Sequence, residues 1–556
     1  MIVIVCLSEL DLRSRSPGPS GGTSSIFHFS SRSSSKVALS QPAVSATTVA
    51  KKLALVPWRK SFDGSGRRIP RPCLSRCTLP TPALYSWLGR KQKVDSVIDF
   101  DKFVKTYDVR GLVGTELTED LIEAFGAGFA DVLQLSGKGL VVGHDMRDSS
   151  PGFAAAFARG ANRVGANVSM IGLCSTDMNY FASGSLGLPA AMFTASHNPA
   201  SYNGIKFSRA GARGISLDTG LAEIRDRAKQ YLEAGIPEAA TLGSTETIDV
   251  MADYVAYVNS LVPLNEIRKL KVVVDVANGM GGLTVPAVLG SNPNLEIVPM
   301  YFELDGTFPN HEANPLDPKN LVDLQQRVVA EGADIGLAFD GDADRCFVVD
   351  ETGASVSPSA VAAIVSAREI ARVKNSEPNP TVLHNLLTSR WVPELIESLG
   401  AVPSRTKVGH SLIKDQMAET GAVFGGEHSA HYYVRDFWGA DNGMLAAMHV
   451  LSELGSQDRK LSEISASHSP YFSSGEINSE VIDRESALER VRVALGADSE
   501  EQFDGTTFAG SLGGNWWWAN IRPSNTEPLL RLNVESNHEA LMVEIRDKAI
   551  AAIRQS

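Results

Sequence analysis

The stretch "KGLVVGHDMRDSSPGFAAAFARGANRVGANVSMIGL", residues 138–173, decides the fold class. It begins with the short apolar run "KGLVVGHD" and ends with "NVSMIGL", and each is typical of a strand. Between them, "SPGFAAAFARGANRVG" places Ala and Phe on one face of a helix. A strand, an amphipathic helix and a second strand in this order indicate a βαβ unit with parallel strands. We therefore expect an α/β protein.

The same rhythm continues along the chain. "LPAAMFTA" predicts a further strand, and "GSTETIDVMADYVAYVNSLV" predicts a helical passage into a second unit that opens with "KLKVVVDVANGMGG". That unit runs through "GADIGLAFDGDADR" to "CFVVDETG", and a third contains "TVLHNLL", "AVPSRTKVGHSLIK" and "AVFGGEHSAHYY". After about residue 470 the pattern changes to an alternating strand, "YFSSGEINSEV", a helix, a Trp-rich strand, "IRPSNTEPLLRLNVES" and a final helix. This last segment predicts a separate α+β unit.

These patterns divide the chain into five segments. We expect a basic extension and then four units, with the boundaries 1–94, 95–245, 246–355, 356–470 and 471–556.

The composition is that of a globular protein of several domains. At 556 residues the chain is too long for one core, and its 43% hydrophobic and 21% charged residues are ordinary values. It has no run of 18 or more apolar residues, so we expect no membrane span. Its five cysteines are scattered and odd in number, which argues against a disulfide framework and for a reducing compartment.

Charge separates the first 94 residues from the rest. They hold 15 Lys or Arg and 3 Asp or Glu, whereas the remainder holds 37 basic and 61 acidic residues. An acidic body is a poor nucleic-acid binder, so we expect no nucleic-acid partner. The first segment is Ser-, Pro- and Arg-rich, as in "SSRSSSK", and predicts no packed core.

Three explanations of this segment stay open: an organellar transit peptide, a disordered basic tail, or a start assigned too early. We favour the last, because ordered-looking sequence begins abruptly at "DSVIDFDKFVKTYDVRG". We accordingly expect a cytoplasmic protein, with a plastid or another organelle as the alternative if the segment is a transit peptide.

The strongest chemical signal is "FDGDADRCF", residues 339–347. Asp340, Asp342 and Asp344 follow a strand at every second position, and three carboxylates this close repel each other unless a cation lies between them. Hard oxygen ligands suit Mg²⁺, and the alternative is an acidic solvated turn. The spacing also fits a calcium-binding EF-hand, but Arg345 stands where that loop requires Gly, so we exclude it. Arg345 could instead bind a phosphate.

Three further clusters are candidates, each with a turn or loop as its structural alternative. "MFTASHNPASYNG" presents Ser196 where a strand ends, as a nucleophile or phosphate carrier. "IRPSNTEP" packs donors suited to a phosphate into one turn: Arg522, Ser524, Asn525 and Thr526. "GGEHSAHYY" offers groups that could hydrogen-bond sugar hydroxyls: Glu427, His428, Ser429 and His431.

Isolated residues give weaker signals. Lone Lys, His or Arg side chains are usually surface or structural groups, which applies to Arg110, Lys206, His410 and Lys414. Arg147 is expected only to pair with Asp145 or Asp148.

Five motifs in order, YDVRG, TASHNP, DGDADR, GEHSAH and RPSNTEP, resemble the α-D-phosphohexomutase family, specifically its bacterial phosphomannomutase/phosphoglucomutase branch. The resemblance covers roughly residues 100–556. It implies an α/β fold of three related α/β domains with mixed sheets and a smaller C-terminal α+β domain around a central cleft.

The resemblance also implies roles for the candidate residues. Ser196 looks like the phosphoserine, and its oxygen would complete a Mg²⁺ site with Asp340, Asp342 and Asp344. By the same resemblance, the residues that would bind the sugar hydroxyls are Glu427, Ser429 and His431. The residues that look like the site for the phosphate that is not transferred are Arg522, Ser524, Asn525 and Thr526. The groups placed around the reacting phosphoryl, as acid/base or electrostatic helpers, are Arg110, Lys206, His410 and Arg345.

The activity implied is reversible interconversion of hexose 1-phosphates and hexose 6-phosphates, with Mg²⁺ as cofactor and a hexose 1,6-bisphosphate as intermediate and primer. Small hexose phosphates are the expected partners, and the protein is expected to be a monomer or homodimer. Ala430 departs from the Gly of many members, whereas Asn525 resembles this branch; the glucosamine-phosphate branch usually has Gly there.

Three alternatives remain at this stage. One is a phosphoglucosamine mutase, and another is a non-catalytic sugar-phosphate-binding protein. The third is a serine hydrolase or phosphatase using Ser196 and His197, against which stands the lack of a G-x-S-x-G elbow around Ser196.

Overall fold

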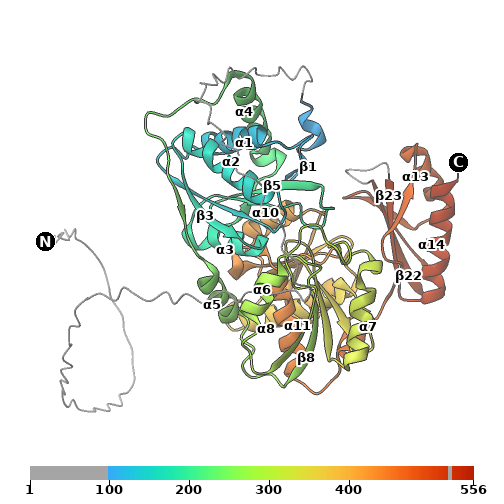
Figure 1. Cartoon of the computed structure of the whole chain (residues 1–556). Coiled ribbons are helices and arrows are strands. Elements are labelled where there is room, and N and C mark those ends of the chain that lie inside the picture. The colour runs from blue at the N-terminus through green and yellow to red at the C-terminus, as the bar shows by residue number, and fades with distance from the viewer. Residues whose placement is uncertain (1–97, 524–528, 556) are drawn as a thin grey trace, which may run out of the picture. The chain divides into compact units, whose positions relative to one another are not determined.

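The computed structural model describes residues 98–523 and 529–555, except for the side chains of residues 410 and 411. Within these ranges the chain forms four sheets, each built from a successive part of the sequence (Figure 1). The expected α/β architecture with a final α+β unit is confirmed. None of the described helices has the length and apolar character needed to cross a membrane.

The first unit is a mixed sheet of seven strands with the order β1-β5-β4-β2-β3-β7, and β6 pairs with β5. Strands β2, β3, β4 and β7 run parallel, whereas β5 is antiparallel to both β1 and β4. The strands are β1 (Val109–Leu112), β2 (Gly139–His144), β3 (Asn167–Leu173), β4 (Ala190–Phe193), β5 (Tyr202–Arg209), β6 (Arg213–Gly214) and β7 (Thr245–Thr247). The helices are η1 (Phe100–Lys102), α1 (Glu119–Val132), α2 (Ser150–Arg163), α3 (Thr176–Leu186), η2 (Leu217–Thr219) and α4 (Leu221–Ala234).

The predicted βαβ unit is present as β2, α2 and β3. Pro151 lies in the first turn of α2, where its missing N–H removes no intrahelical bond. Two glycines let α1 and α2 cross closely: a Cβ on Gly160 would lie 1.8 Å from the carbonyl oxygen of Glu123, and one on Gly126 would lie 2.0 Å from that of Phe157. The small residues of this stretch therefore fix the packing of α2 as well as its amphipathic face.

The second unit is a five-stranded sheet with the order β12-β11-β10-β8-β9. Strands β8, β9 and β10 are parallel, and β11 returns antiparallel to β10. Its strands are β8 (Leu270–Asp275), β9 (Leu295–Met300), β10 (Ile335–Phe339), β11 (Cys346–Asp350) and β12 (Ser355–Val356). Its helices are α5 (Met251–Leu261), α6 (Gly281–Val288), η3 (Pro318–Leu321) and α7 (Val322–Glu331).

The third unit has the sheet order β14-β13-β15-β16-β17, again with parallel and antiparallel pairs. Its strands are β13 (Thr381–Asn385), β14 (Val402–Thr406), β15 (Phe424–Gly426), β16 (Tyr432–Val434) and β17 (Ala440–Asp441). Its helices are α8 (Pro358–Val373), α9 (Trp391–Ser398), α10 (His410–Thr420), η4 (Arg435–Phe437), α11 (Gly443–Gly455) and α12 (Leu461–Ser467).

The fourth unit is an antiparallel sheet with the order β18-β23-β22-β21-β20, and β19 also pairs with β23. The sequence predicted one alternating strand at its start, and the structure divides that stretch into β18 and β19. The strands are β18 (Phe472–Ser473), β19 (Ile477–Glu480), β20 (Ser499–Gln502), β21 (Thr506–Leu512), β22 (Asn515–Pro523) and β23 (Leu529–Ser536). Helices α13 and α14 pack beside each other on this sheet (Figure 1) and span Arg484–Leu495 and Glu539–Arg554.

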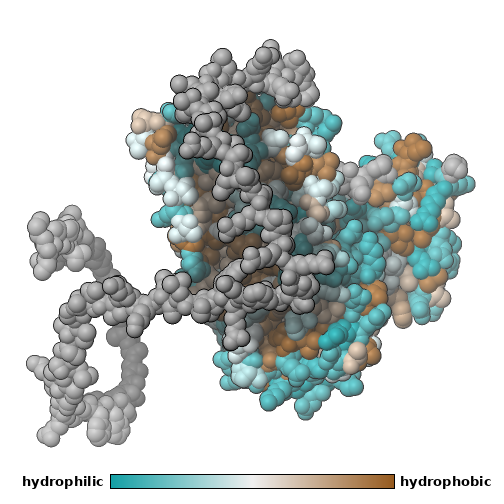
Figure 2. Space-filling model, viewed as in Figure 1, coloured by the Kyte–Doolittle hydropathy of each residue, from teal (hydrophilic) through white to brown (hydrophobic). Residues whose placement is uncertain are grey.

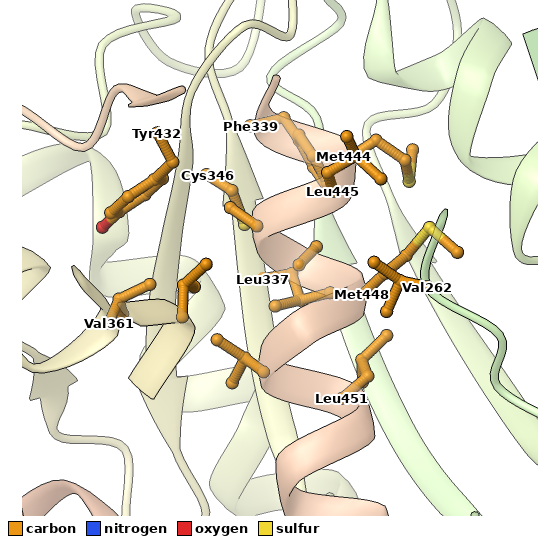
Figure 3. Close-up of a cluster of buried hydrophobic side chains, with 14 of the residues drawn as sticks. Val262, Leu337, Phe339, Cys346, Val361, Tyr432, Met444, Leu445, Met448 and Leu451 are labelled. Atoms are coloured by element: carbon orange, nitrogen blue, oxygen red, sulfur yellow. The ribbon is translucent and has the colours of Figure 1, made fainter. Parts of the chain in front are cut away.

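Helix α11 joins the second and third units. It follows the third sheet in sequence, yet its Met444, Leu445 and Met448 belong to one buried cluster with Leu337 of β10 in the second sheet (Figure 3). One continuous hydrophobic cluster includes residues of the first three units, whereas the fourth unit has a cluster of its own. The first three units are thus joined by a shared core, which fixes loops from different sheets relative to one another.

The exposed hydrophobic side chains are distributed over different units. Val329 of α7 and Val493 of α13 are examples, and hydrophilic and hydrophobic residues are intermixed on the coloured surface of Figure 2.

Candidate active site

The acidic motif forms the loop between β10 and β11. These strands are antiparallel neighbours, with Phe339 opposite Cys346, so residues 340–345 form a tight connection at one end of the sheet. Ala343 adopts a left-handed conformation with φ 62°. Gly341 has no room for a side chain, since a Cβ there would lie 2.3 Å from the carbonyl oxygen of Ser196. The loop is therefore packed directly against the Ser196 backbone.

Ser196 lies three residues beyond the end of β4. Its backbone is left-handed, with φ 47°, which is uncommon for a residue other than Gly. Its Oγ donates a hydrogen bond to Asp340 Oδ2 at 2.9 Å and lies 3.2 Å from His197 Nδ1. The serine hydroxyl of the first unit thus meets the acidic loop of the second.

The three carboxylates form a group that could hold a cation. One oxygen from each of Asp340, Asp342 and Asp344 lies within 4.8 Å of the others, and all three residues are buried. Asp342 Oδ1 and Asp344 Oδ1 are buried and have no hydrogen-bond partner among the described residues. Buried carboxylate oxygens facing one another carry a large free-energy cost unless a positive charge compensates them. Hard oxygen donors of this kind fit Mg²⁺.

Lys206 of β5 supplies part of that compensation. Its Nζ donates to Asp342 Oδ2 at 2.7 Å and to Asp344 Oδ2 at 2.5 Å. Burial acts to lower the pKa of Lys206, but the two carboxylates outweigh it and raise this pKa well above its ordinary value. Lys206 is therefore held as a cation.

The carboxyl groups of Asp340 and Asp342 have pKa values shifted in opposite directions. Burial, together with the charges of Asp344 and Asp342, raises the pKa of Asp340 to about 7. Burial also acts to raise the pKa of Asp342, yet Lys206 reverses this effect and lowers it below the ordinary value. Neighbouring carboxyl groups whose pKa values are shifted in opposite directions are typical of functional sites.

Arg345 connects the acidic loop to His197. Its Nε donates to Asp340 Oδ2 at 2.9 Å, and its Nη2 lies 2.7 Å from His197 Nδ1. Burial, and then the charge of Arg345, hold the pKa of His197 well below its usual range. His197 is thus a neutral imidazole beside the Ser196 hydroxyl.

Arg110 of β1 contacts the loop that carries Ser196. Its Nη1 donates to Asn198 Oδ1 at 2.7 Å, and its Nη2 donates to Asp108 Oδ2 at 2.6 Å. Its guanidinium is 19% exposed, so it can still reach a bound molecule.

The "GEHSAH" loop of the third unit adjoins the acidic loop. Arg345 and His431 form an isolated antiparallel β-bridge, and His431 Nε2 lies 3.8 Å from Asp344 Oδ1. Ser429 Oγ donates to Glu427 Oε2 at 3.3 Å and lies 3.2 Å from His431 Nδ1. Ala430 adopts φ 65°, the left-handed conformation that Gly adopts more readily. The structure therefore brings Glu427, Ser429 and His431 to the edge of the Ser196 site.

The fourth unit contributes Arg522 at the end of β22. Its Nη2 donates to Glu476 Oε2 at 2.7 Å. Three other predicted phosphate-binding residues lie outside the described residues: Ser524, Asn525 and Thr526. The same applies to the side chain of His410, whose backbone begins α10.

The third and fourth units meet at a small polar cavity of about 80 Å³ that includes His428 and Glu535 in its lining. Glu535 Oε2 accepts hydrogen bonds from the Arg390 backbone N–H and from Trp518 Nε1, both at 2.9 Å. Burial raises the pKa of Glu535. The Trp-rich strand therefore packs Trp517 into the fourth unit's own core and presents Trp518 to the third unit.

The sequence did not indicate that Thr176 and Arg147 contact the residues around Ser196. Thr176, at the start of α3, donates through Oγ1 to Asp342 Oδ2 at 2.6 Å and through its N–H to the Asp342 carbonyl at 3.0 Å. Arg147 does pair with Asp145, as one expectation had it, but it also binds the loop that carries Ser196. Their partners are distant in sequence, so only the fold brings them together.

Fold and site together define a four-unit α/β enzyme in which a serine faces a buried carboxylate cluster. Four consecutive stretches match the four domains of one family: phosphoglucomutase/phosphomannomutase alpha/beta/alpha domain I at 101–234, domain II at 252–353, domain III at 358–471 and the C-terminal domain at 476–552. The chain belongs to the phosphoglucomutase/phosphomannomutase family and is an isomerase of the phosphohexose mutase class.

Individual relatives agree with this assignment. The chain is 38% identical over 450 residues to the phosphohexose mutases protein of Xanthomonas campestris pv. campestris, covering 80% of this chain and 98% of that protein. It is 34% identical over 462 residues to the phosphomannomutase of Salmonella montevideo, and the match covers 81% of this chain and 98% of that protein. A phosphoglucomutase/phosphomannomutase family protein from Burkholderia thailandensis has a similar structure, with a TM-score of 0.72, 28% identity and coverage of 83% and 99%.

Proposed function

We propose that this protein is a phosphomannomutase/phosphoglucomutase, which interconverts hexose 1-phosphates and hexose 6-phosphates through a phosphoserine at Ser196. The observation that carries the proposal is the contact between Ser196 Oγ and the carboxylate cluster of residues 340, 342 and 344. A nucleophilic oxygen next to a cation site is what phosphoryl transfer requires, since that reaction depends on positioning and charge neutralisation.

The proposed reaction begins with the phosphorylated enzyme. A free hydroxyl of the hexose monophosphate attacks the phosphorus, the bond from phosphorus to Ser196 Oγ breaks, and a hexose 1,6-bisphosphate forms. The proton that the sugar hydroxyl gives up is balanced by the proton that Ser196 Oγ takes up as it leaves. After the bisphosphate turns around, its other phosphoryl group returns to Ser196. In that step Ser196 Oγ attacks the phosphorus, the bond from this phosphorus to the sugar oxygen breaks, and the serine proton ends on the sugar oxygen. Asp340 Oδ2, which accepts the hydrogen bond of Oγ at 2.9 Å, lies within reach to take up the proton as Oγ attacks and to pass it on.

Three cationic side chains would offset the charge on the transferring group. Lys206 and Arg345 are buried at the carboxylate cluster, and Arg110 is held by Asp108 with part of its guanidinium exposed. Fixed charges in a site that excludes water act more strongly than in solution. Mg²⁺ would be held by Asp340, Asp342, Asp344 and a phosphoserine oxygen, and when bound it would supply further charge neutralisation.

Substrate contacts are proposed for the third and fourth units. Glu427 and Ser429 would hydrogen-bond sugar hydroxyls, and Glu427 is itself oriented by the Tyr433 hydroxyl at 3.0 Å. Arg522, with residues 524–526, would bind the phosphate that is not being transferred. When the substrate binds, Arg522 would replace part of its hydrogen bonding to Glu476 with hydrogen bonds to the substrate phosphate. The proposed substrates are glucose and mannose phosphates. The protein is also proposed to be a monomer or homodimer and to act in the cytoplasm.

The test is conversion of mannose 1-phosphate and of glucose 1-phosphate to the 6-phosphates, with Mg²⁺ and a trace of glucose 1,6-bisphosphate. Turnover of either sugar is expected, and Ser196→Ala is expected to abolish it. Ser201→Ala is the matched control, because Ser201 is an exposed serine nearby in the same stretch of chain. Near-normal turnover by the Ser196→Ala variant would contradict the phosphoserine mechanism.

A further inference from the structure

Arg147 is a buried arginine whose guanidinium is directed at one loop. It lies just after β2, and its side chain is 1% exposed. Nη1 donates to the carbonyl oxygens of Pro199 at 2.9 Å and Tyr202 at 3.0 Å. Nη2 donates to those of Ser196 at 3.0 Å and Asn198 at 2.6 Å. One guanidinium therefore binds four backbone carbonyls within seven residues, the segment that begins at Ser196.

Arg147 is itself held from two sides. Within the first unit, Asp145 pairs with its Nε at 3.2 Å and accepts its backbone N–H at 3.0 Å. From the second unit, the Phe308 ring lies 5.1 Å from the guanidinium carbon. Gly306 makes the close approach possible, because a Cβ there would lie 2.7 Å from Arg147 Cα. The guanidinium is thus fixed by the unit that carries the serine and by the unit that carries the carboxylates.

The hydrogen bonds from Arg147 stabilise a backbone conformation of the Ser196 loop that is unfavourable by itself. Ser196 is left-handed at φ 47°, and four carbonyls turned toward one point repel one another unless a cation lies between them. Charge-assisted hydrogen bonds from a planar guanidinium can satisfy several carbonyls at once, whereas a lysine ammonium presents its donors from one atom. Arg147 donates to all four of these carbonyls, those of residues 196, 198, 199 and 202, and the carbonyl of Pro199 also accepts the backbone N–H of Tyr202 at 3.0 Å.

We infer that Arg147 is a positioning residue for the proposed phosphoryl transfer. It acts through the carbonyls of the Ser196 loop and keeps Oγ aligned with the carboxylate cluster, without touching the substrate. The inference rests on the proposed function for its kinetic consequence. Its structural part, that Arg147 orders residues 194–204, does not depend on any activity.

The test compares Arg147→Lys with the matched control Arg163→Lys. Arg163 belongs to α2 in the same unit, and its guanidinium binds the Ile236 carbonyl at 2.9 Å and Glu123, away from Ser196. We expect Arg147→Lys to lower kcat by about 100-fold, the scale of an ångström of misplacement, with KM changed by only a few-fold. We expect Arg163→Lys to leave both constants near wild type.

Two further readouts separate positioning from general destabilisation. Hydrogen exchange of the peptide covering residues 194–204 should become faster in Arg147→Lys, while peptides of the fourth unit keep wild-type protection. Added guanidinium should restore part of the kcat of Arg147→Ala and should leave Arg163→Ala unaffected. If Arg147→Lys fails to fold, Phe308→Leu, which loosens the guanidinium from the other side, is expected to lower kcat several-fold with unchanged KM.

Wild-type kcat and wild-type exchange in Arg147→Lys would overturn the inference. It would also be overturned by faster exchange throughout the chain with no rescue by guanidinium, since that result describes a structural residue only. If the wild-type protein shows no mutase turnover, the proposed function fails, and the exchange experiment still decides whether Arg147 orders the serine loop.

Discussion

Replacing Lys206 by Met tests the electrostatic basis of the site. Lys206 is 10% exposed, and its carboxylate partners Asp342 and Asp344 are 0% and 1% exposed. Removing one member of a buried ion pair costs about 3–5 kcal/mol, because the remaining charge is left uncompensated. Here two carboxylates lose their shared partner, so we expect Lys206→Met to lose about that amount of stability without Mg²⁺.

Mg²⁺ should reverse part of this loss. A ligand that binds only the folded state at about 100 times its Kd adds about 2.7 kcal/mol, and the variant lacks the ammonium that otherwise occupies the carboxylates. The assay is urea unfolding of wild type and variant, each with EDTA and with saturating MgCl₂. The gap between their midpoints should be large in EDTA and should narrow in Mg²⁺.

The control is Lys548→Met, which removes an exposed lysine from its pair with Glu544 on α14. Its midpoint should stay close to wild type in both buffers, because surface pairs contribute little. If Lys206→Met unfolds at the wild-type midpoint in EDTA, or if Mg²⁺ leaves the gap unchanged, the reasoning that Lys206 and a cation compensate the same carboxylates is refuted.

Three further predictions concern the surroundings of the site. Gly341→Ala should lower kcat by about 100-fold with a folded protein by circular dichroism, because its Cβ must displace the Ser196 carbonyl, and wild-type turnover would contradict this. Burial raises the pKa of Asp177 to about 6, so its protonated form favours folding at low pH and this contribution is lost as the pH rises through about 6. The urea midpoint of Asp177→Asn should therefore rise relative to that of the wild type as the pH increases from about 4 to about 7. A difference between the two midpoints that does not change with pH would exclude this titration. Ala430→Gly should raise stability by about 0.5–1 kcal/mol in thermal unfolding without loss of activity, since φ 65° suits Gly, whereas lower stability would show that the Ala side chain contributes packing.

Local patterns were sufficient for much of the fold. The strand, helix and strand between residues 138 and 173 follow from apolar spacing and from small residues that permit close helix packing. The acidic motif was predicted to be a loop after a strand, and it connects β10 and β11. Each of these features depends on neighbours in sequence, which a single sequence contains.

Features that depend on distant partners could not be predicted in the same way. Helix α11 packs on the second sheet although it follows the third. The spacing of its apolar residues predicts a buried face but does not say which sheet that face covers. Arg147 has an acidic neighbour two residues away, which suggested a local ion pair, but its carbonyl partners come 49 to 55 residues later. Carbonyl oxygens occur at every residue, so no side-chain pattern marks them as ligands of an arginine.

The phosphoserine mechanism is tested most directly by following one phosphoryl group through Ser196. The protein is incubated with glucose 1,6-bisphosphate and Mg²⁺, freed of small molecules, and then mixed with a single equivalent of mannose 1-phosphate or glucose 1-phosphate. Intact mass and peptide mapping should show a phosphoryl group gained at Ser196 and lost on mixing, with a hexose 1,6-bisphosphate appearing at the same rate. Turnover of hexose phosphates by a protein that never carries phosphate on Ser196 would contradict a phosphoserine mechanism.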